Sequence, residues 1–73
     1  FRLEVLIPVG SEAEIFLPKL NLDNITVREG GALVWSENAY RPGRPGLTGG
    51  RQTDSAVILQ AGSGRYVFEL EGQ

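Results

Sequence analysis

The sequence predicts an all-β fold, namely a small antiparallel β-sandwich of about six to eight short strands. Apolar and polar residues alternate with a period of two along most of the chain, as in strands with one buried face. Ten glycines and four prolines interrupt this alternation at short intervals. No window shows the apolar spacing of an amphipathic helix. Because one small sheet could not bury two apolar faces, two layers are expected.

Two strands are predicted near the N-terminus. Residues 1–7 alternate apolar and polar side chains, and Pro8 ends this strand. Gly10 and Ser11 supply a turn, after which residues 12–17 alternate again. The short connection predicts that these two strands pair as a hairpin.

Two shorter strands follow a polar connector over residues 21–24. The first carries Ile25 and Val27, and the second carries Leu33 and Trp35. A Gly30-Gly31 pair lies between them, as in a tight two-residue turn. This segment is therefore expected to form a second hairpin.

Residues 37–54 are predicted to form a long Pro/Gly-rich loop. The prolines are Pro42 and Pro45, and the glycines are Gly43, Gly46, Gly49 and Gly50. This density of interrupting residues is incompatible with a helix or a central strand. Loops longer than about 12–15 residues are unusual in compact domains, so this one is expected to be either functional or mobile.

The last two strands are expected at residues 57–59 and 66–70. The glycines at 62 and 64 indicate a tight turn between them. A phosphate-binding loop is disfavoured there because such loops open a helix, whereas a strand follows here. The complete predicted core, with Phe1 only partly covered, is Leu3, Val5, Ile7, Ala13, Ile15, Leu17, Ile25, Val27, Leu33, Val57, Leu59, Tyr66 and Phe68.

Composition excludes several classes of function. The 73 residues support one domain, residues 1–73, with a thin core. Without cysteine or histidine, the chain has no disulfide, thiolate metal site or histidine base, and we expect no cofactor. A net charge of -2 and the absence of a long apolar run favour neither nucleic acid nor membrane as a partner. Since the chain lacks methionine and starts within an alternating run, we interpret it as a piece of a longer protein.

The strongest candidates for binding are an aromatic and arginine set in and beside the 37–54 loop. The set comprises Trp35, Tyr40, Arg41, Arg44 and Arg51. Such side chains can form a platform for a sugar ring or for the carboxylates of a partner. The alternative interpretation is that the tryptophan belongs to the core and the arginines are solvated.

Two carboxylates, Glu12 and Glu14, lie two residues apart on one predicted strand and therefore share a face. Glycosidases use paired carboxylates about 5–9.5 Å apart, a distance that neighbouring residues on an outward face also satisfy. We interpret this pair as part of a solvated face. The sequence thus predicts neither a catalytic residue nor a metal site.

Four segments together resemble the C-terminal β-sandwich domain of bacterial α-L-rhamnosidases. They are residues 5–11 (VLIPVGS), 13–18 (AEIFLP), 25–31 (ITVREGG) and 62–68 (GSGRYVF), in matching order and spacing. The resemblance covers nearly the whole chain except residues 37–54.

The resemblance implies an accessory domain and not an enzyme. In such rhamnosidases a separate α/α barrel carries out an inverting hydrolysis, with a carboxylic general acid and a carboxylate that activates water. None of those residues is present here. The terminal sandwich packs against the rest of its chain, so the expected partners are the catalytic and other domains of a parent enzyme. Two alternatives remain: a carbohydrate-binding module that uses the arginine loop, and an adhesion or assembly domain whose edge strands pair with a partner.

Overall fold

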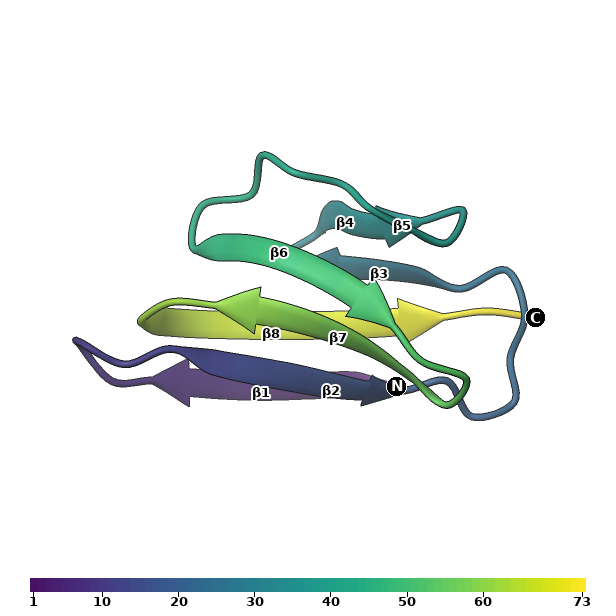
Figure 1. The fold of residues 1–73 in the computed structure, drawn as a ribbon, viewed down its shortest axis with the longest axis horizontal. Coiled ribbons are helices and arrows are strands. Elements are labelled where there is room, and N and C mark those ends of the chain that lie inside the picture. The colour runs from purple at the N-terminus through teal and green to yellow at the C-terminus, as the bar shows by residue number, and fades with distance from the viewer.

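The computed structural model describes residues 1–73 as eight strands in two antiparallel sheets packed face to face (Figure 1). The predicted all-β sandwich is therefore confirmed. In the five-stranded sheet the order is β1 (Arg2–Ile7), β8 (Gly64–Glu71), β3 (Thr26–Glu29), β4 (Ala32–Ser36) and β5 (Ala39–Tyr40). In the three-stranded sheet it is β2 (Ala13–Pro18), β7 (Ala56–Ala61) and β6 (Leu47–Gln52). There is no helix, and hence none suited to crossing a membrane.

The expected hairpin between the first two strands is wrong. β1 pairs with β8, whereas β2 pairs with β7 in the other sheet. The link between them crosses from one layer to the other, and within it the Ser11 N–H donates to the Pro8 carbonyl at 3.0 Å. Figure 1 shows β1 and β2 one behind the other at the same side of the sandwich. Alternation predicted both strands correctly, but it carries no information on which strand each one pairs with.

One apolar core lies between the two sheets. Most of its predicted members are buried, and Leu3, Val5 and Ala13 pack against its margin. Phe1 is 48% exposed, in line with the expected partial cover. The fully buried large side chains come from both layers: Phe68, Leu17, Leu59, Leu70, Val27, Val34 and Val57.

Leu33 is the exception to the predicted core, because it lies on the outer face of β4. The register between β3 and β4 shifts after Val27, which pairs with Trp35, while Arg28 pairs with Leu33. Val34 is the additional residue of this β-bulge. Because a bulge places two successive side chains on nearly the same side, Val34 and Trp35 are both buried and Leu33 points outward.

The prediction of an irregular segment over residues 37–54 is also wrong, since it contains β5 and β6. β6 is an edge strand, which is where glycine is best tolerated. Gly50 is required by a close approach: a Cβ there would lie 2.9 Å from Leu59 Cδ2 and 3.0 Å from Tyr40 Cδ1. A glycine that resembles a strand breaker in the sequence therefore permits the packing of this strand.

The turn predicted at Gly62-Ser63-Gly64 is confirmed, and it links β7 to β8 across the two layers. The Tyr66 hydroxyl lies 2.9 Å from the Gly62 carbonyl oxygen and 3.2 Å from that of Ser63. Its ring stacks on Phe68 with centroids 5.9 Å apart. The Tyr66 ring thus packs in the core, while its hydroxyl contacts the link between β7 and β8.

Candidate functional site

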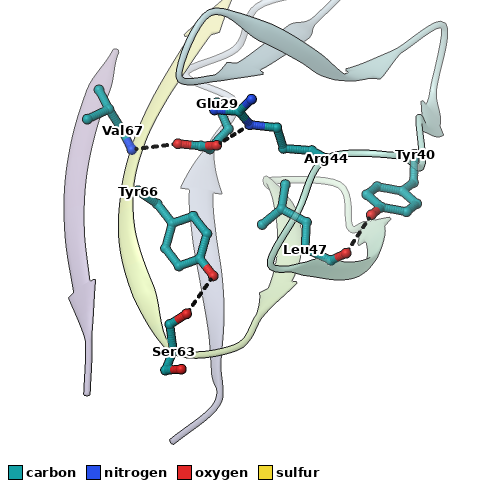
Figure 2. Close-up of polar contacts among 7 residues, drawn as sticks. All are labelled: Glu29, Tyr40, Arg44, Leu47, Ser63, Tyr66 and Val67. Carbon is teal, nitrogen blue, oxygen red and sulfur yellow. Dashed lines mark hydrogen bonds and ion pairs between the residues drawn. The ribbon is translucent and has the colours of Figure 1, made fainter. Parts of the chain in front are cut away.

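The aromatic members of the predicted binding set lie side by side but face inward. Trp35 pairs with Tyr40 across β4 and β5, and only 2% of Trp35 is exposed. Tyr40 packs against the core and donates from its hydroxyl to the Leu47 carbonyl at 3.2 Å (Figure 2). A sugar could not stack on the Trp35 ring without local opening of the sheet.

Arg44 is held by a nearly buried carboxylate, that of Glu29 at the end of β3. The Arg44 Nε donates to Glu29 Oε1 at 2.6 Å, and the Val67 backbone N–H donates to Glu29 Oε2 at 3.1 Å (Figure 2). Glu29 is 5% exposed. Its two oxygens therefore join three parts of the chain: β3, β8 and the connection between β5 and β6.

Two glycines leave room for this arrangement. A Cβ at Gly30 would overlap the Arg44 guanidinium, and a Cβ at Gly46 would overlap the Tyr66 hydroxyl. Both glycines also have positive φ, 57° and 90° respectively. The Arg-Pro-Gly segment at 44–46 thus packs closely against the sheet. The Arg44 side chain binds Glu29 of the same chain.

The other two arginines also have carboxylates of the same chain beside them. Arg41 donates from Nε to Ser36 Oγ at 2.9 Å and lies 3.8 Å from the Glu37 carboxylate. Arg51 pairs with Glu14 at 2.5 Å on the outer face of the three-stranded sheet. Arg51 thus lies in a different sheet from Trp35, and the structure does not gather the predicted set into one surface.

Glu12 and Glu14 line a shallow hollow of about 280 Å³ together with Thr48 and Gln60. The hydrogen bond from Arg51 lowers the pKa of the Glu14 carboxyl, and the charge of the guanidinium acts in the same direction. A glycosidase general acid needs the opposite, a raised pKa, so that it stays protonated near neutrality. No three potential ligands from Asp, Glu, His and Cys gather as a metal site would require.

Sequence reasoning missed Glu29, the most buried charged side chain in the molecule. A signal for it does exist, since Glu29 lies two residues after the core residue Val27 on the same strand. Period-two alternation therefore places its carboxylate on the inner face, where a carboxylate needs a partner. Which cation supplies that partner depends on how the 37–54 segment folds.

No family model, curated protein or solved structure matches this chain. The resemblance to the rhamnosidase domain accordingly depends on the four sequence segments.

Proposed function

We propose that this chain is a non-catalytic β-sandwich accessory domain of a glycoside hydrolase of the α-L-rhamnosidase type. It packs against and supports the rest of a parent enzyme that hydrolyses terminal α-L-rhamnosides. The observation that carries the proposal is the order and spacing of the four segments at 5–11, 13–18, 25–31 and 62–68.

The positions of these segments in the fold support the proposal. They supply all of β2 and β3, the end of β1 and most of β8. They also supply most of the link from β1 to β2 and the link from β7 to β8, both of which cross from one sheet to the other. The segment outside the resemblance, residues 37–54, forms β5 and β6, which are edge strands. The segments that carry the resemblance therefore contribute strands to both sheets of the sandwich and links between them.

The use of charged groups within the chain also supports a non-catalytic role. The Glu29 carboxylate accepts hydrogen bonds from Arg44 and from the Val67 backbone N–H, and the Glu14 carboxylate forms an ion pair with Arg51. The pKa of the Glu14 carboxyl is lowered by its hydrogen bond from Arg51, whereas a general acid beside a substrate needs a raised pKa. A carbohydrate-binding role has less support, because the Trp35 ring is buried.

The first test is an assay of the isolated chain on an aryl α-L-rhamnoside, where we expect no turnover above the buffer rate. Glu14→Gln serves as the matched variant, because it removes the charge of the one carboxylate that lines a hollow and has a shifted pKa. Turnover by the native chain that disappears in this variant would contradict a non-catalytic role.

The second test uses the full gene product, with and without residues 1–73. We expect the full product to hydrolyse the aryl α-L-rhamnoside. Deletion should lower its thermal denaturation midpoint while leaving kcat within about threefold, because the reacting groups lie in another domain. A full product without this activity, or a deletion that abolishes kcat in a protein that remains folded, would refute the proposal.

A further inference from the structure

Three of the four edge strands carry features that hinder pairing with another chain. β5 has only two residues, and β6 shifts register between Leu47 and Gly49. β2 ends at Pro18. The Lys19 N–H donates to the Ser55 carbonyl, so the backbone of Lys19 points toward β7. In an antiparallel ladder, successive residues point their backbone groups alternately toward and away from the neighbouring strand. The backbone nitrogen of Pro18 therefore points to the free edge of β2, where it offers no hydrogen-bond donor.

β1 has none of these features. Its six residues contain neither glycine nor proline, and they pair with β8 in an uninterrupted register. Phe1 and Leu70 exchange two backbone hydrogen bonds, of 3.1 and 2.8 Å. Because hydrogen-bonded and non-bonded pairs alternate, Leu3 and Val5 also bond to β8, whereas the backbone groups of Arg2 and Glu4 point to the free edge.

The side chains of β1 are suited to a second copy of the same strand. Arg2 and Glu4 lie on the outer face, with side chains 61% and 64% exposed, and they form a 3.1 Å ion pair. On the opposite face Leu3 and Val5 are only partly buried. The strand therefore offers free hydrogen-bonding groups, both signs of charge and an incompletely covered apolar margin.

Charge selects one register for such a pair. If Leu3 faces Leu3 of an antiparallel second copy, Arg2 of each chain lies opposite Glu4 of the other, and both positions have outward backbone groups. If Glu4 instead faces Glu4, two carboxylates of like charge lie directly opposite each other, which is destabilising.

We propose that two copies of this chain associate by antiparallel pairing of their β1 edges, with Leu3 opposite Leu3 and Arg2 opposite Glu4. The two five-stranded sheets become one continuous sheet, and the apolar margins of both sandwiches cover each other. The contact is short, so association is weak and depends on concentration. This inference goes beyond the accessory function and does not depend on it.

The test compares Arg2→Glu and Glu4→Arg with the native chain by sedimentation velocity from micromolar to millimolar concentrations. The native chain should form dimers toward the upper end. Each variant alone places like charges opposite each other and should lower the association constant about tenfold or more. A one-to-one mixture of the two variants should recover association, because one chain then presents two negative charges and the other two positive charges.

The matched control is Glu37→Arg, the same charge change at the β4–β5 turn, with a side chain that is 89% exposed. It should associate like the native chain. In a mixture of labelled and unlabelled native chains, methyl contacts between Leu3 of the two copies should identify the register. A native chain that stays monomeric at millimolar concentration, or dimers that neither charge variant weakens, would overturn the proposal.

Discussion

At the scale of single residues, Gly46 shows how one missing side chain can decide local packing. Its φ of 90° disfavours any other residue, and a Cβ would overlap the Tyr66 hydroxyl. We expect Gly46→Ala to lower the free energy of unfolding by about 2–4 kcal/mol, from backbone strain together with displacement of the tyrosine.

The matched control for this substitution is Gly10→Ala. Gly10 has a similar φ of 82°, but nothing lies within 4 Å of the position of its Cβ. It should cost about 1 kcal/mol, the strain alone. Urea denaturation of both variants measures the difference, and equal costs would show that the contact with Tyr66 is unimportant.

Glu14 provides a prediction on pH. Its pKa is lowered from the ordinary value of 4.5, chiefly by the hydrogen bond from Arg51. A carboxyl whose pKa is lower in the folded state stabilises that state above its unfolded pKa, and the contribution disappears as pH falls through the folded pKa. The stability difference between the native chain and Arg51→Ala should therefore shrink as pH falls below 4.5.

An NMR titration of the Glu14 side chain measures the same effect directly. In Arg51→Ala the pKa of Glu14 should rise toward 4.5, because its main hydrogen-bond donor is lost. A pKa of Glu14 that is the same in both proteins would exclude Arg51 as the cause.

At the scale of elements, Glu29 joins β3, β8 and the β5–β6 connection. In Glu29→Ala the Val67 N–H loses its acceptor in a partly buried position, whereas the Arg44 side chain, 36% exposed, regains part of its hydration. We expect a loss of about 1–3 kcal/mol in the free energy of unfolding, mostly from the unsatisfied backbone donor.

Urea denaturation suits this measurement because urea does not screen ion pairs as a guanidinium salt does. Glu37→Ala is the control, since it removes a carboxylate whose 3.8 Å ion pair is largely in solvent. Its unfolding midpoint should match that of the native chain. A Glu29→Ala protein with an unchanged midpoint would contradict the role assigned to this carboxylate.

At the scale of the whole molecule, the two sheets share one core, with buried residues from both layers in a single cluster. Neither sheet can bury its apolar face alone, so we expect both to unfold in one transition. Trp35, the only tryptophan, reports on the five-stranded sheet by fluorescence, while the amide signals of Ile15 and Leu59 report on the other sheet by NMR. Different urea midpoints for the two probes would contradict a shared core.

The period of two along β1, β2 and β8 and the short apolar run of β7 were sufficient to predict those strands and most of the core, because both patterns are local consequences of strand geometry. The turn before β8 was likewise predictable from its glycines. Alternation failed at Leu33, where the bulge adds one residue and reverses the face of the preceding side chain.

Three features depended on the tertiary structure. They are the pairing of β1 with β8, the formation of β6 within a glycine-rich segment, and the carboxylate partners of Arg44 and Arg51. Each joins residues far apart in the chain, and the order of strands in two layers determines which of them meet. The local pattern specifies which face of a strand is apolar, but the burial of all such faces in one core decides where each strand lies.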